Sequence, residues 1–322
     1  MSYWNGKRVL VTGGTGFIGS HCVERLLEHG AHVRVIGRNR DSFEKHLHSV
    51  EQEVDFQVGD LTDVLAIDRA VADQDMLVHL AAFVAGIGYN VDHPASMIQR
   101  NLELGLPTMT TAAQAGVARI VCVSSACVYP RHCSVPTPES EGFDDDPEPT
   151  NFGYGWAKRL LEVHAHALHE EFGSSVAIVR PYNGYGPRDN FSEETSHVIP
   201  ALLKRADDAQ DILEIWGDGT QTRSFLYVTD FVDGILTAAE HAPNSDPINI
   251  GTHEEVTIGE LAQHVINTVN PKLRLEFDTT KPRGQPRRAG NLDRADAIGF
   301  SAQVSLPDGL ERTFDWYRRS HE

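Results

Sequence analysis

The chain has 322 residues, which is long enough for one large or two small domains, and its 40% hydrophobic and 23% charged residues are typical of soluble globular proteins. The formal net charge of −18 argues against nucleic acid or an anionic membrane surface as a partner. No apolar run reaches membrane-spanning length, and no signal-peptide core precedes the first predicted strand, so we expect a cytoplasmic protein. The 4 cysteines contain no CxxC pair, so the sequence predicts neither a disulfide framework nor a metal site.

The first half of the chain alternates short apolar runs with amphipathic stretches. The apolar runs predict strands over residues 7–14, 32–38, 54–60, 75–82, 118–125 and 175–181. The amphipathic stretches predict helices over residues 18–30, 63–72, 95–116 and 153–173. This order predicts an α/β fold, in which a doubly wound parallel sheet is covered by helices on both faces.

The pattern is less regular elsewhere. Residues 131–150 are rich in proline and acidic residues and predict a surface loop, either a solvated connector or a lid over the site. Beyond residue 181 we expect a helix near 197–206, a short strand around 212–217, and a strand over 225–230 that leads into a helix over 231–242.

A glycine motif directly follows the first predicted strand. Gly13, Gly16 and Gly19 are spaced GxxGxxG and open the first predicted helix, with Phe17 and Ile18 between them. Glycine lets backbone N–H groups approach a pyrophosphate, which then lies at the positive end of the helix. We therefore expect a Rossmann-type dinucleotide domain over residues 1–180, to which some later segments return, and a smaller, interleaved substrate domain mainly over 181–322.

The end of the second predicted strand bears on which dinucleotide is bound. A cofactor with a free ribose 2′-hydroxyl calls for Asp or Glu there, whereas this chain has Gly37 and Arg38 and no acid until Asp41. Because a guanidinium binds a 2′-phosphate in bidentate fashion, NADP is favoured over NAD. The further predicted cofactor-binding residues are Asp60, Leu61, Ala81 and Pro181.

Tyr154 and Lys158 lie four residues apart in a predicted helix and so project from one face. A lysine ammonium beside a phenol favours the phenolate, so we expect Lys158 to lower the pKa of Tyr154. With the glycine motif, and with Ser125 at the end of the fifth strand, this pair resembles the extended short-chain dehydrogenase/reductase family over nearly the whole chain. The resemblance implies that Ser125, Tyr154 and Lys158 polarise a carbonyl or carbinol during hydride exchange with a nicotinamide, and that Tyr154 and Lys158 also contact the cofactor.

Cys127 lies two positions after Ser125. On a strand this spacing puts both side chains on the same side, so we expect the thiol to face the substrate if the serine does. Residues 182–205 and 277–288, together with this cysteine, resemble the GDP-L-fucose synthase family of 3,5-epimerase/4-reductases. The resemblance implies that Cys127 and His197 form an acid/base pair. It also implies a GDP-sugar site that contains Asn183, Arg205, Trp216, Arg223 and Lys281.

Inversion of a carbon beside a ketone requires one group to remove a proton and another to deliver one on the opposite face. A thiol and an imidazole, which titrate near 8.5 and 6.5 when unperturbed, suit this exchange near neutral pH. The residue types that the resemblance assigns therefore match the chemistry.

A second resemblance competes with the first. Residues 124–130 and 216–225 resemble the GDP-mannose 3,5-epimerase family, whose reaction involves no net redox change. That family has a lysine where this chain has His197, and an acid at the end of the second strand where this chain has Arg38, which favours the epimerase/reductase. Ala126, in place of a serine, departs from the epimerase/reductase pattern.

A non-catalytic cofactor-binding regulator is the alternative from another functional class. Such a protein tolerates the loss of Tyr154, Lys158 or Cys127, and the presence of all three argues against it. The family resemblance also implies a homodimer, in which each subunit contributes two helices to the interface.

Overall fold

The computed structural model describes residues 2–192, 195–281 and 285–321. Its centre is a seven-stranded sheet in which neighbouring strands are parallel. Strands β4 and β5 are buried at every position, as expected for central strands that are covered on both faces. In spatial order the strands are β11 (Pro247–Ile250), β6 (Ser175–Pro181), β5 (Arg119–Val123), β4 (Met76–His79), β1 (Arg8–Thr12), β2 (His32–Gly37) and β3 (Val54–Val58).

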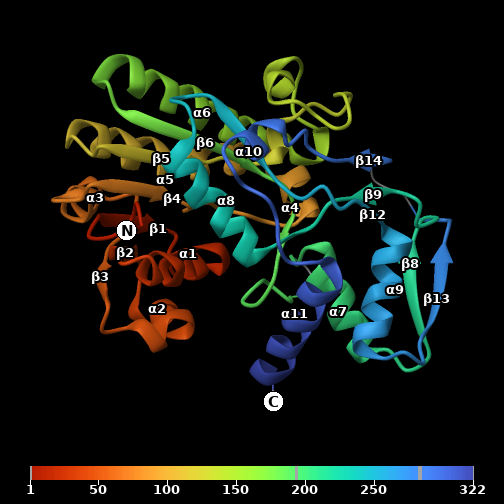
Figure 1. Cartoon of the computed structure of the whole chain (residues 1–322). Helices are drawn as coiled ribbons and strands as arrows, with labels where there is room; N and C mark the ends of the chain where they lie inside the picture. Colours follow the sequence, from red (N-terminus) through yellow and green to blue (C-terminus); the bar gives the residue numbers. More distant parts are fainter. Residues whose placement is uncertain (1, 193–194, 282–284, 322) are drawn as a thin grey trace.

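Helices cover both faces of this sheet, which confirms the predicted fold class (Figure 1). One layer contains α1 (Phe17–Glu28), α2 (Arg40–Leu47) and α8 (Val228–His241). The other contains α3 (Val64–Val71), α5 (Pro94–Gln114) and α6 (Phe152–Phe172), preceded by the short α4 (Ile87–Asp92). Among the helices of the described residues, none combines the length and apolar character needed to cross a membrane.

The order of the strands reverses between β1 and β4. The chain runs outward from β1 to β3 on one side and from β4 to β6 on the other. In sheets of this kind, ligands bind at the carboxyl ends of the strands beside the reversal. The glycine motif follows β1 and Ser125 follows β5, so both lie at that edge.

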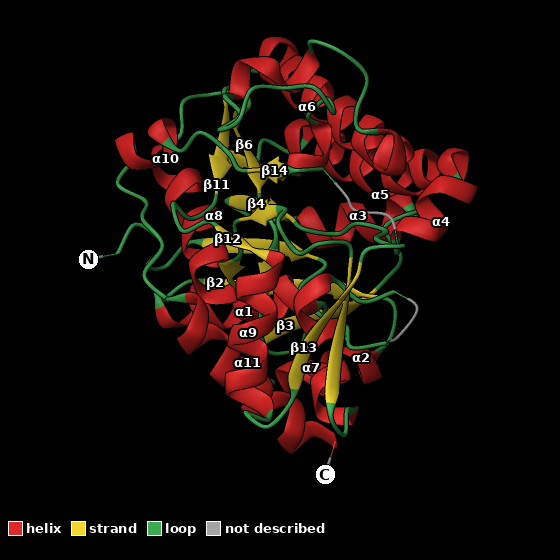
Figure 2. Cartoon of the chain, turned by 90° about the vertical axis from the view of Figure 1, so that its right-hand side faces the viewer, coloured by secondary structure: helices red, strands yellow, loops and turns green. Residues whose placement is uncertain are grey.

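The later part of the chain builds a smaller lobe with its own apolar core (Figure 2). Three later elements, α8, β11 and α10 (Asp293–Ala297), pack with the large sheet instead. The domain boundary near residue 180 stays a prediction. The remaining elements are β7 (Gly184–Tyr185), α7 (Val198–Asp208), β8 (Ile212–Trp216), β9 (Thr222–Arg223), β10 (Leu226–Tyr227), β12 (Val256–Thr257), α9 (Ile258–Val269), β13 (Arg274–Asp278), β14 (Arg287–Arg288) and α11 (Leu306–His321).

The loop over residues 131–150 is more structured than predicted. It contains the 3₁₀ helix η3 (Glu139–Phe143) and leads into η4 (Pro149–Asn151), and the side chains of Glu139 and Glu148 are buried. Asp144, Asp145 and Asp146 are exposed. The structure describes this whole loop, and none of it lines the cleft described below. The loop is therefore a surface connector, as predicted, that is anchored by buried residues.

Candidate active site

A cleft of about 1,920 Å³ opens at the carboxyl ends of the parallel strands, and both lobes contribute to its wall. All the predicted catalytic residues line it: Ser125, Cys127, Tyr154, Lys158 and His197. So do the predicted cofactor-binding residues Gly13, Gly16, Phe17, Ile18, Gly19, Arg38, Asp60, Leu61, Ala81 and Pro181. The folding of the chain thus brings together residues that are up to 184 positions apart in the sequence, from Gly13 to His197.

The glycine turn after β1 forms a cradle of backbone atoms. Gly13 has a φ of +71°, and a Cβ there would lie 2.8 Å from the backbone nitrogen of Ala81, so glycine alone fits. Helix α1 begins at Phe17 with no side-chain cap, so its first N–H groups are available to an anion. The ring of His46 supports the turn, because its Nδ1 lies 2.9 Å from the carbonyl oxygen of Thr15.

Arg38 and Asp60 lie on the wall beyond this cradle. The Asp60 carboxylate accepts hydrogen bonds from Thr62, which lower its pKa, and the positive charge of Arg38 lowers it further. Arg40, by contrast, is paired with Glu44 at 3.2 Å and with Glu51, so its guanidinium is already neutralised. The glycine cradle and the exposed Arg38 fit a nicotinamide dinucleotide.

Tyr154 and Lys158 lie one turn apart on α6 and both line the cleft. Lys158 is only 2% exposed, its Nζ donates to the carbonyl oxygen of Val123 at 2.8 Å, and it lies 5.6 Å from the centre of the Tyr154 ring. Burial lowers the pKa of Lys158. Burial is the main cause that raises the pKa of Tyr154, and the nearby Cys127 raises it further. The prediction that Lys158 lowers this pKa is wrong here, because the ammonium is bound to the strand end and faces the ring.

Ser125 and Cys127 both line the cleft, but the predicted reason is wrong. Strand β5 ends at Val123, and Ser125 caps the 3₁₀ helix η2 (Ala126–Val128). The Ser125 hydroxyl oxygen accepts a hydrogen bond from the Cys127 N–H at 3.1 Å. Strand alternation therefore does not apply to these residues. A tight turn, in place of an extended strand, brings the two side chains to one wall.

His197 reaches the cleft from the second lobe, immediately before α7. Its Nδ1 lies 3.7 Å from Oδ1 of the buried Asp189, and its side chain is 58% exposed. The interaction with the Asp189 carboxylate raises the pKa of His197 and outweighs the opposite effect of burial. The same carboxylate accepts a hydrogen bond from the backbone N–H of Asn190 at 2.7 Å. The buried carboxylate next to the imidazole therefore extends its protonated form to higher pH.

Arg288 is a cleft residue that was not predicted from the sequence. Strand β14 pairs with β9 in a register that places Arg288 opposite Arg223, and the positive charge of Arg288 lies in the cleft wall near Cys127. The signal in the sequence is the Arg287–Arg288 pair that closes segment 277–288. Residues 282–284 of that segment lie outside the described residues, as do 193–194 of segment 182–205.

Of the predicted substrate-binding residues, Asn183 lines the cleft and its side-chain amide donates to the carbonyl oxygen of Ser224 at 2.9 Å. The other four are not among the described residues that line the cleft: Arg205, Trp216, Arg223 and Lys281. They belong to the second lobe. Arg205 donates to the carbonyl oxygen of Glu214 on β8, and the Nζ of Lys281 lies 5.6 Å from the centre of the Trp216 ring. Arg223 is paired in register with the cleft residue Arg288.

Comparison with known proteins now places the chain. Residues 9–251 match the NAD-dependent epimerase/dehydratase family. The chain belongs to this family. A dTDP-4-dehydro-6-deoxy-D-allose reductase of Streptomyces sp is 35% identical over an alignment of 320 positions that covers 98% of this chain and 97% of the relative. The GDP-L-fucose synthase of Escherichia coli (strain K12) is 33% identical over an alignment of 332 positions that covers 98% of this chain and 98% of the relative.

Solved structures agree with this membership of the epimerase/dehydratase family. A UDP-glucose 4-epimerase from Thermotoga maritima, solved with UDP-glucose, has a TM-score of 0.85 at 27% identity and covers 98% of this chain and 100% of its own. The chain is an NAD(P)-dependent enzyme of the short-chain dehydrogenase/reductase type, as the sequence resemblance implies. In the part of the chain that the structure describes, no cluster of three or more His, Cys, Asp or Glu side chains is arranged to hold a metal ion.

Proposed function

We propose that this enzyme is an NADP-dependent nucleotide-sugar epimerase/reductase. It epimerises a GDP-4-keto-6-deoxyhexose at C3 and C5 and then reduces C4 with NADPH. The proposal rests on one arrangement: Cys127 and His197 reach a single cleft from different lobes, and that cleft also contains Ser125, Tyr154 and Lys158. A thiol and an imidazole beside a carbonyl-handling set provide what epimerisation next to a ketone requires.

Epimerisation begins at the C4 ketone. Ser125 and Tyr154 hydrogen-bond the ketone oxygen and stabilise the enolate that forms when a neighbouring C–H loses its proton. Cys127 takes that proton as a thiolate, with the guanidinium of Arg288 beside it. His197 delivers a proton to the opposite face of the same carbon, which its raised pKa favours. One proton leaves and one arrives, so the sugar is inverted without net redox change.

Reduction uses the same ketone. When bound, the nicotinamide cofactor supplies a hydride to C4. Tyr154 donates the proton that the C4 oxygen needs, and its raised pKa keeps the phenol protonated for this role. Lys158 lies buried between the tyrosine ring and the end of β5, where its ammonium would hold the nicotinamide ribose.

The charge distribution supports a sugar diphosphate as the substrate. A protein with a net charge of −18 repels phosphates unless cations gather locally. Arg223 and Arg288 are neighbours on β9 and β14, and Arg288 lines the cleft. Trp216 is 55% exposed and offers a ring on which a purine base can stack, with Lys281 over the ring. A GDP moiety that extends from the cleft over β9 and β8 uses all of these groups.

One experiment tests the proposal directly. The protein is incubated with GDP-4-keto-6-deoxymannose and either NADPH or NADH, and separately with GDP-mannose alone, while nicotinamide absorbance and sugar products are followed. We expect stoichiometric NADPH loss in the first incubation, slower loss with NADH because Arg38 lacks its phosphate partner, and no reaction of GDP-mannose. Conversion of GDP-mannose without added cofactor would contradict the proposal and support a GDP-mannose 3,5-epimerase.

The Streptomyces relative favours a second candidate, a reductase of a dTDP-4-keto-6-deoxyhexose. That relative is as similar to this chain as the fucose synthase is, and it covers as much of it. The same assay with the dTDP sugar in place of the GDP sugar separates the two. If kcat/KM for the dTDP sugar exceeds that for the GDP sugar, the second candidate replaces the first.

We also propose a homodimer built through α5 and α6. These two helices pack along each other, and α6 exposes Leu160 and Val163 at 41% and 53%. Light scattering on the purified protein tests this proposal. A dimer mass that falls to a monomer mass in a Leu160→Arg, Val163→Arg variant is expected, and a monomer mass for the unmodified chain contradicts the proposal.

A further inference from the structure

Buried side chains anchor the turn that carries Ser125 and Cys127 on both of its sides. On the entry side, the hydroxyl of Ser124 donates to Oε1 of Glu162 on α6. On the exit side, the hydroxyl of Tyr129 donates to Oδ1 of Asn249 on β11 at 2.5 Å and accepts from Nη1 of Arg180 on β6 at 3.1 Å. Ser124 and Tyr129 thus bracket the two cleft residues in the sequence.

Ser124 and Tyr129 contact the two partners of one buried ion pair, Glu162 and Arg180. Arg180 binds Glu162 in bidentate fashion, from Nε to Oε1 at 2.9 Å and from Nη2 to Oε2 at 2.7 Å, and both side chains are buried. Nη1 of Arg180 also donates to the carbonyl oxygen of Glu139 at 2.7 Å. A Cβ on Gly142 would overlap the guanidinium, so a glycine there allows the loop to close over the pair.

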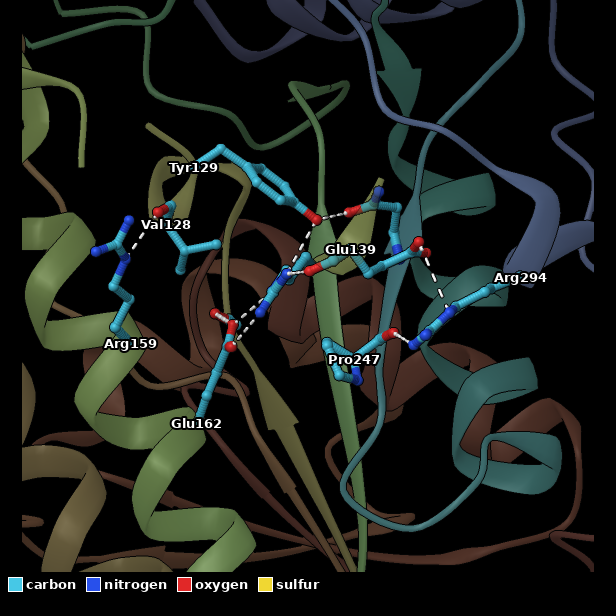
Figure 3. A network of polar contacts seen from close by, with 10 residues as sticks. Val128, Tyr129, Glu139, Arg159, Glu162, Pro247 and Arg294 are labelled. Carbon is cyan, nitrogen blue, oxygen red and sulfur yellow. Dashed lines mark hydrogen bonds and ion pairs between the residues drawn. The ribbon is translucent and has the colours of Figure 1, made fainter. Parts of the chain in front are cut away.

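The network extends to the loop over residues 131–150 (Figure 3). Oε1 of Glu139 accepts from the backbone N–H of Asn249 at 3.0 Å, and its Oε2 lies 3.8 Å from Nε of Arg294. On α6, Nε of Arg159 donates to the carbonyl oxygen of Val128 at 2.9 Å. Figure 3 shows Arg159 beside Val128, and Arg294 on the far side of the network, where it contacts Glu139 and Pro247 and not the turn. The side chains that hold the exit of the turn directly come from α6, β6 and β11.

These anchors do not touch the reacting atoms. Tyr129, Glu162, Arg180 and Asn249 are not among the described residues that line the cleft. A buried ion pair is seldom more stabilising than apolar packing of the same volume, whereas a satisfied buried network fixes one geometry. What the network fixes is the orientation of the turn.

We propose that Tyr129 is a positioning residue for Cys127, and that the Glu162–Arg180 pair is the fixed point through which it acts. The entry side has a second support, because the Ser124 N–H donates to the carbonyl oxygen of Val179 at 2.8 Å. The exit side is held by the Tyr129 hydroxyl, by Arg159 and by a longer, weaker backbone hydrogen bond, from the Glu148 N–H to the carbonyl oxygen of Tyr129 at 3.4 Å. Loss of the Tyr129 hydroxyl therefore displaces Cys127 more than Ser125. The catalytic consequence rests on the proposed function, whereas the placement of the thiol does not.

The test compares Tyr129→Phe with a matched variant, Tyr227→Phe. Tyr227 on β10 is also buried, the guanidinium carbon of Arg312 lies 5.8 Å from the centre of its ring, and it is not among the described residues that line the cleft. The first measurement is alkylation of Cys127 by iodoacetamide between pH 6 and 9, followed on its own peptide by mass spectrometry so that Cys133 does not interfere. We expect Tyr129→Phe to change the alkylation rate by about threefold or more and to shift its pH profile, because thiol reactivity follows its surroundings.

The second measurement is solvent deuterium exchange at C3 and C5 of the GDP-4-keto sugar, in the presence of oxidised NADP so that reduction does not compete. We expect Tyr129→Phe to lower this rate by about tenfold or more, since small displacements of a reacting group have large effects. NADPH affinity should stay within about twofold, since the glycine cradle is not touched. Tyr227→Phe should match the unmodified protein in all three measurements.

The outcomes separate this proposal from the proposed function. If the unmodified protein exchanges no deuterium with any GDP-4-keto sugar, the proposed function fails, and the alkylation measurement still decides the role of Tyr129. If Cys127 in Tyr129→Phe keeps the alkylation rate and pH profile of the unmodified protein, the positioning role is overturned. It is also overturned if Tyr227→Phe changes the alkylation of Cys127 equally, or if Tyr129→Phe loses NADPH binding in proportion, because both results indicate a general loosening of the fold.

Discussion

Two turns line the same cleft and are held in opposite ways. The glycine turn after β1, residues 13–19, is shaped by its own backbone, through a positive φ and close approaches that exclude a Cβ. The turn after β5, residues 124–129, is shaped by side chains that come from α6, β6 and β11. One of its bonds joins residues that are 120 positions apart in the sequence.

The difference follows from what each turn presents. The glycine turn offers N–H groups to an anion, and backbone geometry alone determines where they point. The turn after β5 offers a hydroxyl and a thiol, whose positions depend on how firmly the turn is held. Substitutions in the first turn should therefore change cofactor affinity, whereas substitutions around the second should change the reactivity of Cys127.

The largest expected effect comes from the thiol itself. Cys127→Ser keeps the size of the side chain and removes the acidic S–H, so deuterium exchange at C3 and C5 should fall by about 10²- to 10⁴-fold, the usual contribution of a general base. NADPH affinity should not change, because the glycine turn is intact. Mass spectrometry of the recovered sugar measures the exchange. An unchanged rate would remove Cys127 from the mechanism.

A smaller effect is expected in the glycine turn. Gly13→Ala puts a side chain at a φ of +71° and brings a Cβ within 2.8 Å of the Ala81 nitrogen. The left-handed backbone alone costs about 1–2 kcal/mol, and the overlap adds to it, so NADPH affinity should fall by about tenfold or more. Isothermal titration measures the affinity. Alkylation of Cys127 is the control and should not change; if it changes as much as the affinity, the two turns are not independent.

The corresponding substitution that should disturb the turn after β5 is Gly155→Ala on α6. A Cβ there would overlap the carbonyl oxygen of Cys127 and lie 2.6 Å from Cβ of Pro147. Such overpacking costs about 1–3 kcal/mol, so we expect a lower free energy of unfolding and slower deuterium exchange. NADPH affinity should be retained.

Gly259→Ala on α9 is the control for Gly155→Ala, because its Cβ would meet nothing closer than 3.4 Å. Urea unfolding and the exchange assay compare the two variants. Equal stability and equal exchange in both would show that α6 does not constrain the turn.

The same contrast explains what the sequence predicts and what it does not. Some features are visible in short stretches of sequence: the glycine turn, the alternation of strands and helices, and the Tyr154–Lys158 pair on which the family resemblance depends. These local features led to the correct fold class. The geometry of Ser125 and Cys127 depends on Arg180 and Glu162, which are remote in sequence, so strand spacing gave a wrong reason for their common orientation.

Electrostatics was the least predictable part of the site. The four-residue spacing placed Lys158 beside Tyr154 correctly, but only the structure shows the ammonium bound to Val123 and the pKa of the phenol raised. Arg288 was missed because its link to Cys127 comes from the pairing of β14 with β9, two short strands that are 65 positions apart from Arg223 to Arg288. Burial and the pairing of distant strands determine these properties, and neither can be predicted from a local sequence pattern.

The smallest expected effect is on the pH dependence, and it concerns His197, which reaches the cleft from the second lobe. Its pKa is raised by the Asp189 carboxylate, so the imidazolium, and with it the proposed acid, persists to higher pH than in a free histidine. The fraction of His197 in the imidazolium form, followed by NMR of the ring, should therefore fall as pH rises through this raised pKa. Any stability from the pair is present below the unfolded pKa of about 6.5 and is lost over the same rise.

Asp189→Asn keeps the oxygen that accepts from the Asn190 N–H and removes the negative charge. At a fixed pH near neutrality the exchange rate should then fall, because less of His197 is protonated. Because His197 is more than half exposed, solvent weakens its interaction with Asp189, and we expect only a small shift of the His197 titration to lower pH. An exchange rate that rises in this variant contradicts the assignment of His197 as the acid and would make it the base opposite a Cys127 acid.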